Sequence, residues 1–226
     1  MNGLAIDSAI TKITISAKND SHTTTAVFNI GMKQSETLLP AIQYVLEKVE
    51  LKPENLDYIS ISNGPGSFTG LRLGFSAAKA IEMATNAKLY GINTLDAYAE
   101  PFKDFPYAVL SCIDAKKDRF YAKAFLNAKE ILPEGDYTPE EIADFLKNLS
   151  QAENILICGS DAHLLAEQLK PFSEKKFLPQ NFNINAGEIL LSMAEAKIAA
   201  DEKPLNDYDG PFYLRASEAE VKKQSL

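Results

Sequence analysis

The stretch ISISNGPGSFTGLRLGFSAAKAIEMA, residues 59–84, joins an apolar strand to a helix rich in small residues through a loop that contains three glycines. Glycine accepts positive φ angles, and the backbone N–H groups at the start of a helix can bind an anion. The loop is therefore either a tight structural turn or an anion-binding nest, and its residues alone leave both interpretations open.

The loop lacks three familiar enzymatic motifs. Leu71 and Arg72 follow its last glycine, where a P-loop needs Lys and Ser or Thr. The third glycine falls one place too late for a dinucleotide fingerprint, and Phe68 occupies the centre, where a nucleophile elbow needs serine. A ligand-binding role would therefore rest on the loop motif itself, which is Gly64, Pro65, Gly66, Ser67, Thr69, Gly70 and Arg72.

The helix after the loop places Gly74, Ala77 and Ala78 close together. Small side chains let another helix approach closely, either inside the fold or across a subunit interface. Their spacing alone favours packing inside the fold.

The composition indicates an ordinary globular protein. The 226 residues can form one large domain or two small ones, and a net charge of −8 predicts no long-range attraction to nucleic acid or to an anionic membrane. No run of 18 apolar residues occurs, and the start MNGLAIDSAI does not resemble a signal peptide, so we expect a cytoplasmic protein with no membrane contact. We expect Cys112 and Cys158 to be buried free thiols.

Strand and helix patterns alternate along the chain and predict α/β layers with mixed sheets. Expected strands cover residues 3–7, 12–16, 23–29, 57–62, 88–92, 107–113, 119–126 and 154–158. Expected helices cover residues 35–51, 71–84, 94–99, 138–149, 160–169 and 185–200, with Thr94 as an N-cap and a capping box from Thr138 to Glu141. Pro101 and Pro106 predict a boundary between an N-terminal lobe, residues 1–103, and a C-terminal lobe, residues 104–207, with the tail 208–226 as a candidate addition to the first.

Two segments echo each other: AIDSAITKITIS, residues 5–16, and CIDAKKDRFYAK, residues 112–123. Each puts Ile-Asp at the end of a strand and continues into a second strand, which favours an internal duplication or is coincidence. A duplication would leave a cleft between two halves, with Asp7 and Asp114 facing each other across it. These aspartates are candidate magnesium or nucleotide ligands, and they are equally ordinary residues for a turn.

Metal ligands and acid–base catalysts are scarce. His22 and His163 are the only histidines, and neither has a second histidine or a cysteine at ligand spacing. We therefore expect no metal site and no catalytic residues of the histidine type.

The run GPGSFTGLRLGFSAAK, residues 64–79, followed by KLYGINTLDAYA, resembles the signature of the TsaB (YeaZ) family of bacterial tRNA threonylcarbamoyladenosine (t6A) biosynthesis proteins. Weaker similarities extend over nearly the whole chain: LAIDSAI (4–10), SETLLPAI (35–42), CIDAKKDRFYAKAF (112–125), ILICGSDA (155–162) and FYLRASEAEVKK (212–223). The resemblance implies the two-lobed fold of the actin, Hsp70 and sugar-kinase (ASKHA) superfamily, with duplicated mixed-sheet α/β lobes.

Members of that superfamily bind nucleotide between the lobes, so the resemblance implies Asp7, Ser8, Thr11 and Asp114 as nucleotide-binding candidates. Ser8 and Ala115 stand where the superfamily has glycine, which weakens the expectation of ATP hydrolysis by this chain. ATP or ADP with magnesium is then expected, if anywhere, at the interface of a complex.

The paralogous TsaD family carries two metal-binding histidines where this chain has Thr94 and Tyr98, which bind iron or zinc poorly. The resemblance thus implies a non-catalytic paralogue, a subunit of a threonylcarbamoyl transferase complex. It implies docking to a TsaD-like subunit, homodimerisation when alone, cooperation with a TsaE-like ATPase, and contact with tRNA only through the complex. The implied partner and dimer face lies on the helix at residues 71–84: Leu71, Gly74, Phe75, Ala77, Ala78 and Ile81.

Two other functions are consistent with the residues. One is an independent phosphotransferase of the kinase-like superfamily, and the other is a glycoprotease-like peptidase. The isolated histidines argue against the peptidase.

Overall fold

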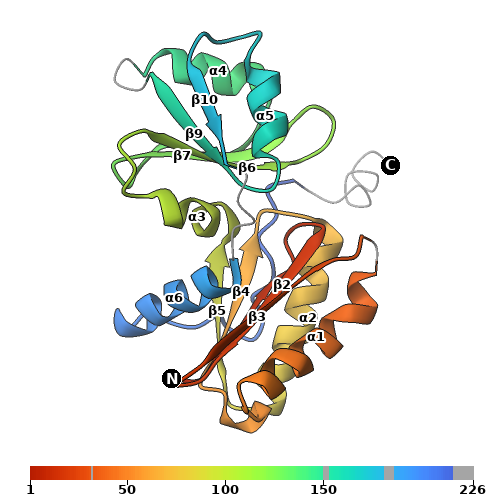
Figure 1. Ribbon diagram of the computed structural model, residues 1–226. Coiled ribbons are helices and arrows are strands. Elements are labelled where there is room, and N and C mark those ends of the chain that lie inside the picture. The colour runs from red at the N-terminus through yellow and green to blue at the C-terminus, as the bar shows by residue number, and fades with distance from the viewer. Residues whose placement is uncertain (32, 150–152, 181–185, 216–226) are drawn as a thin grey trace. The chain divides into compact units, whose positions relative to one another are not determined.

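The computed structural model describes residues 1–31, 33–149, 153–180 and 186–215, which divide between two compact units (Figure 1). Unit 1 comprises Met1–Ala97 and Asn185–Phe212, and unit 2 comprises Tyr98–Ile184 with the chain from Tyr213 onward. The sequence predicted a boundary at residue 103. The division falls instead after Ala97, because Ala99 and Phe102 are buried in a core cluster of unit 2.

Unit 1 contains a five-stranded sheet of order β3-β2-β1-β4-β5. The first three strands form an antiparallel meander, and β4 and β5 run parallel to β1. Its elements are β1 (Gly3–Asp7), β2 (Lys12–Lys18), β3 (Thr23–Asn29), α1 (Gln34–Lys48), the short helix η1 (Pro53–Asn55), β4 (Tyr58–Gly64), α2 (Phe68–Ala84) and β5 (Lys88–Asn93).

Unit 2 repeats this arrangement with the order β10-β9-β6-β7-β8. Its elements are β6 (Ala108–Asp114), β7 (Phe120–Leu126), β8 (Lys129–Tyr137), α4 (Pro139–Lys147), β9 (Asn154–Cys158), α5 (Ala162–Leu169) and β10 (Lys176–Pro179). In each unit a meander of three strands precedes two helix–strand pairs, and the central strand is the first. The predicted duplication and fold class are therefore confirmed.

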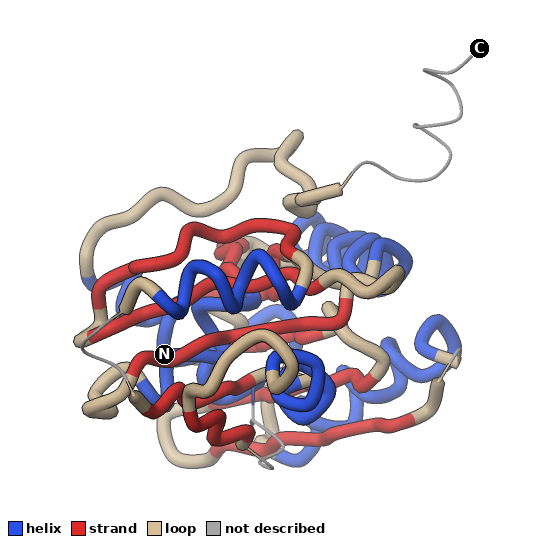
Figure 2. Tube along the Cα trace, turned by 90° about the horizontal axis from the view of Figure 1, so that it is seen from above, coloured by secondary structure: helices blue, strands red, loops and turns tan. Residues whose placement is uncertain are grey.

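The chain that follows the last strand of each sheet joins the other unit. After β5 come α3 (Thr94–Ala99) and η2 (Glu100–Phe102), whose Ala99 and Phe102 pack with Val109 and Leu156 of unit 2. After β10 comes α6 (Ala186–Ala199), which belongs to unit 1 and contacts β1, β2, β4 and β5. Beyond α6 the chain has no helix or strand up to Arg215 (Figure 2, tan).

The two faces of the unit 1 sheet differ in chemistry because side chains alternate along each strand. Leu4, Ile15 and Ile59 represent the apolar face, which packs in one core cluster with residues of α1 and α2. The other face carries small or polar residues and lies under α6. There Ser60 Oγ donates to Leu190 O at 2.8 Å, and a Cβ on Gly187 would meet Ser16 Oγ at 2.0 Å, so glycine is required for this close approach.

A partly buried polar group fastens the far part of α6 to the same face. Glu195 accepts a hydrogen bond from the Tyr58 hydroxyl at 2.9 Å and an ion-paired hydrogen bond from Lys18 Nζ at 2.7 Å. Partial burial acts to raise the pKa of Glu195, but the hydrogen bonds from Lys18 and Tyr58 outweigh it and hold the pKa below its ordinary value. Glu195 therefore stabilises unit 1 as an anion.

Several local predictions are confirmed, and others need correction. Thr138 and Glu141 form the predicted capping box, and both cysteines are free and buried, with burial raising the pKa of Cys158 to about 12. Strands β8 and β10 were not predicted, because each contains proline. The cap of α3 is Asn93 and not Thr94, since Asn93 Oδ1 accepts from Asp96 N. The predicted cap at residue 185 lies outside the described residues.

We expect Glu195→Gln to lower the free energy of unfolding by about 1 kcal/mol at neutral pH, because the ion pair with Lys18 is lost. The pKa of Glu195 is lowered in the folded state, so its contribution is complete above the ordinary carboxyl pKa and disappears as pH falls through the folded value. The difference between wild type and variant should therefore shrink in acid. Urea unfolding across a pH series measures this.

Glu202→Gln serves as the matched control, because Glu202 pairs with Lys197 at an exposed site near the end of the same helix. It should change stability little. If the difference in unfolding free energy between wild type and Glu195→Gln did not change with pH, the proposed link between the pKa of Glu195 and stability would be wrong.

Candidate functional site

The glycine loop between β4 and α2 packs on the turn that follows β1. Ser67 N donates to Ala9 O at 2.7 Å, and the Ser67 hydroxyl caps α2 by accepting from Gly70 N at 3.3 Å. A Cβ on Gly66 would lie 2.4 Å from Ala9 O, and a Cβ on Gly70 would lie 2.1 Å from Ser8 O. Glycine is required at both positions, because the loop backbone lies directly against the carbonyl groups of Ser8 and Ala9 and leaves no space for a side chain.

Gly64, before the loop, and Gly74, in the helix after it, also lie in close contacts. Gly64 has φ of +113°, and a Cβ there would lie 2.2 Å from Phe212 O, while Phe212 N donates to Asn63 O at 2.7 Å. A Cβ on Gly74 would meet Ser8 Oγ at 2.2 Å. Every glycine of the segment thus has a packing role, which favours the structural-turn interpretation. Pro65 is buried, whereas Ser67, Thr69 and Arg72 are exposed.

Two of the three predicted nucleotide ligands of unit 1, Asp7 and Ser8, are buried. Asp7 is 1% exposed, and its Oδ1 accepts from Ser62 Oγ at 2.7 Å and from Ala9 N at 3.1 Å. Ser8 is fully buried and donates to Gly70 O at 2.8 Å. Thr11 is exposed. Asp7 and Ser8 are thus engaged inside unit 1, Asp7 by β4 and Ser8 by the glycine segment.

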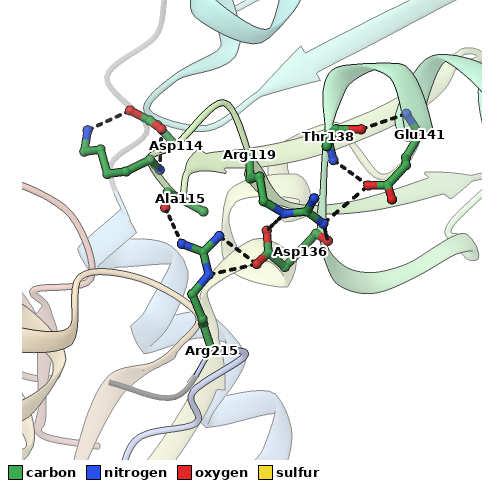
Figure 3. A network of polar contacts seen from close by, with 8 residues as sticks. Asp114, Ala115, Arg119, Asp136, Thr138, Glu141 and Arg215 are labelled. Carbon is green, nitrogen blue, oxygen red and sulfur yellow. Dashed lines mark hydrogen bonds and ion pairs between the residues drawn. The ribbon is translucent and has the colours of Figure 1, made fainter. Parts of the chain in front are cut away.

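In unit 2, the carboxylate of Asp114 is hydrogen-bonded to a residue of its own turn. Its carboxylate accepts from Lys116 N at 2.7 Å and from Lys116 Nζ at 2.6 Å (Figure 3). Its backbone N–H donates to Asp161 Oδ2 at 3.0 Å. Lys116 thus neutralises the Asp114 carboxylate within the turn.

Next to this turn, two arginines converge on one carboxylate (Figure 3). Arg119 Nε donates to Asp136 Oδ1 at 2.9 Å, and Arg215 donates from Nε and Nη2 to Oδ2 at 2.9 and 2.7 Å. Arg215 Nη1 also donates to Ala115 O at 3.0 Å. No local sequence pattern predicts this cluster, because Arg215 and Asp136 are 79 residues apart. It attaches the C-terminal segment to unit 2.

The structure places most of the predicted partner face inside unit 1. Leu71, Gly74, Phe75, Ala77 and Ala78 are buried on the side of α2 that faces the sheet and α1, and only Ile81 is partly exposed. The outward side of α2 instead carries Arg72, Ser76, Ala80, Met83 and Ala84. A helix of small residues gave no polarity signal to distinguish these two sides.

The residues at the position of the TsaD histidines are interior. Thr94 is fully buried with its Oγ1 unpaired, and Tyr98 is 2% exposed. Among the described residues, no group of three or more His, Cys, Asp or Glu could hold a metal ion. None of the helices in the described ranges is long and apolar enough to cross a membrane.

The family model of TsaD, tRNA N6-adenosine threonylcarbamoyltransferase, matches residues 31–179. The chain belongs to this family. Within it, the chain is 25% identical over 230 residues to the tRNA threonylcarbamoyladenosine biosynthesis protein TsaB of Bacillus subtilis, covering 98% of this chain and 97% of that protein. TsaB of Escherichia coli is 27% identical over 158 residues, which covers 66% of this chain and 68% of that one.

A solved structure of YeaZ from Pseudomonas aeruginosa matches with a TM-score of 0.77 and 19% identity, over 94% of this chain and 99% of that one. This match shows a shared fold. The predicted resemblance to TsaB (YeaZ) is thus confirmed. Residues 216–223 of the similarity noted at the C-terminus lie outside the described residues.

We expect Gly74→Ala to destabilise the protein by about 1–3 kcal/mol, because the new methyl group overlaps Ser8 Oγ. In a Ser8→Ala background the nearest atom would be 3.4 Å away. There the same substitution should become neutral, or stabilising by up to about 1 kcal/mol, because alanine is the better helix former. Chemical denaturation of the wild type, the two single variants and the double variant measures these free energies of unfolding. An equal loss of stability on Gly74→Ala in both backgrounds would contradict the prediction.

Arg215→Ala should release the C-terminal segment from unit 2 and cost about 1–2 kcal/mol, since three hydrogen bonds are lost. Arg215→Lys should recover little, because an ammonium group cannot reach Asp136 and Ala115 together as the planar guanidinium does. Hydrogen exchange at Tyr213 and Leu214 gives the readout, with Lys170→Ala, at an exposed ion pair, as control. Unchanged exchange in both Arg215 variants would refute the attachment.

Proposed function

We propose that this protein is a non-catalytic subunit in t6A formation on tRNA, and that it acts by docking to a TsaD-type catalytic subunit. The proposal is supported by its similarity to TsaB proteins, which are named for t6A biosynthesis, along almost the whole chain. Thr94 and Tyr98 at the position of the TsaD histidines support a non-catalytic role, because neither replaces an imidazole as a metal ligand.

The observation that carries the proposal is the outward side of α1 and α2, which pack side by side in unit 1 (Figure 1). We call it the α1–α2 outer face. It includes Leu39, 61% exposed, Tyr44, 48% exposed, and Met83, 87% exposed. Next to Met83, Ala80 and Ala84 are also exposed. Large apolar side chains beside small ones suit a helix-to-helix contact with a partner.

In this proposal the buried small residues have a different task from the exposed ones. Gly74 and Ala78 bring α2 close to the sheet, which fixes the helix so that its outer side is presented rigidly. Preorganised contact surfaces lose less entropy on binding. The glycine loop thus contributes to partner binding by positioning α2.

The remaining tasks fall to other members of the complex. A net charge of −8 leaves the tRNA phosphates to other subunits. ATP or ADP with magnesium would bind with the partner or a TsaE-like ATPase that the complex recruits, because Asp7 and Ser8 are already engaged internally. The same burial weighs against an independent phosphotransferase.

We expect Met83→Glu and Leu39→Glu to weaken binding to the TsaD-type protein of the same organism by about tenfold or more each, because a charge replaces an apolar contact. Isothermal titration calorimetry measures the affinity, and t6A formation in the reconstituted system should fall in parallel. Substitutions at Gly74 or Ala77 would disturb the fold itself, since both residues are buried.

Leu164→Glu on α5 is the matched control, because Leu164 is an exposed leucine, 43% accessible, on a helix of unit 2. It should leave the affinity unchanged. Wild-type affinity in both the Met83 and the Leu39 variants would refute the α1–α2 outer face as the docking surface.

A further inference from the structure

The turn between β6 and β7 has a strained backbone. Its three central residues, Lys116, Lys117 and Asp118, have φ angles of +62°, +58° and +54°. Left-handed backbone is costly for residues with a Cβ atom, and it normally occurs at single positions or at glycine. The segment 115–119 contains no glycine. Three consecutive left-handed residues persist only where surrounding contacts hold them in that conformation.

The hairpin itself supplies part of this constraint. Ala115 N donates to Arg119 O at 2.9 Å, and Arg119 N donates to Lys116 O at 3.3 Å, so the two ends of the turn are joined. Asp114 accepts from both the backbone N–H and the ammonium group of Lys116. A three-residue hairpin loop usually has a single left-handed residue. Closing the hairpin therefore does not by itself impose three.

A further constraint comes from a distant segment of the chain. Arg215 Nη1 donates to Ala115 O, directly before the left-handed residues (Figure 3). Arg215 also donates to Asp136 Oδ2, and Asp136 Oδ1 accepts from Arg119 Nε, directly after the left-handed residues. Both ends of the strained turn are thus connected to one carboxylate, and the connection at Ala115 is made by the C-terminal segment.

We propose that the docking of Arg215 and the left-handed turn at residues 116–118 form one two-state switch. In the docked state Arg215 holds Ala115 O, and the turn stays left-handed. When Arg215 leaves, the turn relaxes, and the relief of strain offsets part of the lost hydrogen bonding. The C-terminal segment thus controls a turn that lies 100 residues away in the chain. A partner that takes up Arg215 would change the turn without touching it.

The turn between β7 and β8 provides a comparison within the same unit. Asn127 and Ala128 also have positive φ angles, +51° and +60°. Leu126 pairs with Lys129 directly across this turn. Two left-handed residues in a two-residue loop are the ordinary geometry of a tight hairpin, because their twist matches that of the strands. The hairpin geometry alone accounts for this second turn, so it serves as a control for the first.

The first test follows the turn when Arg215 is removed. NMR coupling constants of the isotope-labelled full chain report the sign of φ at residues 116–118. Wild type should show positive φ at all three, and Arg215→Ala should bring Lys116 or Lys117 to negative φ, because the contact with Ala115 O is lost. Lys170→Ala, which breaks an exposed ion pair of unit 2, should leave the turn unchanged. Three positive φ angles retained in Arg215→Ala would overturn the proposal.

The second test starts from the turn and keeps Arg215. Coupling between two sites is reciprocal, so a less strained left-handed turn should dock Arg215 more firmly. Lys117→Gly removes the backbone cost, whereas Lys117→Ala removes the same side-chain contacts and keeps that cost. Exchange of the Arg215 Nε proton, which is donated to Asp136, should be about twofold to fivefold slower in the glycine variant than in the alanine variant.

The control for this test is Ala128→Gly, which relieves left-handed backbone at the turn between β7 and β8. It should leave exchange of the Arg215 Nε proton at the wild-type rate. Equal exchange rates in Lys117→Gly and Lys117→Ala would show that the turn and the docking of Arg215 are independent, and would overturn the proposal. A slower rate in Ala128→Gly as well would also overturn it, in favour of a general gain in stability of unit 2.

Discussion

The two units depend on an exchange of helices between the halves of the duplicated chain. The sheet of unit 1 has one apolar face, which its own α1 and α2 cover, and one face of small and polar residues, which α6 covers. Because α6 approaches so closely that Gly187 meets Ser16, serine and tyrosine hydroxyls of the sheet find partners on the helix. Without α6, groups that are now buried, such as Ser60, would be exposed to solvent on an uncovered face of the sheet. The exchange thus completes the framework that holds α2.

The position of α2 shows how one stretch of sequence can serve packing and, by proposal, recognition. Glycines at 66, 70 and 74 bring the helix against the turn at Ser8 and Ala9. The second unit fills the equivalent turn in another way, with Lys116 on Asp114. Both turns are therefore occupied by the chain itself.

Much of the fold could be predicted from local patterns, because alternation and capping act over a few residues. The strands at 3–7, 23–29 and 154–158 and the capping box at Thr138 are examples. The candidate site was harder. Gly74 and Ala77 carry no polarity, so the sequence could not tell which side of α2 faces the core. The pairing of Arg215 with Asp136 and the transfer of α6 to unit 1 depend on contacts between distant segments, which leave no local pattern.

The position of α6 in the chain also has a consequence for biosynthesis. A ribosome must synthesise nearly 200 residues before the helix that covers the first sheet exists, at about 5–20 residues per second. During that interval the nascent N-terminal half exposes the sheet face that α6 later covers. Chaperones that shield such surfaces are therefore expected to matter more for this chain than for a protein whose N-terminal domain closes on itself.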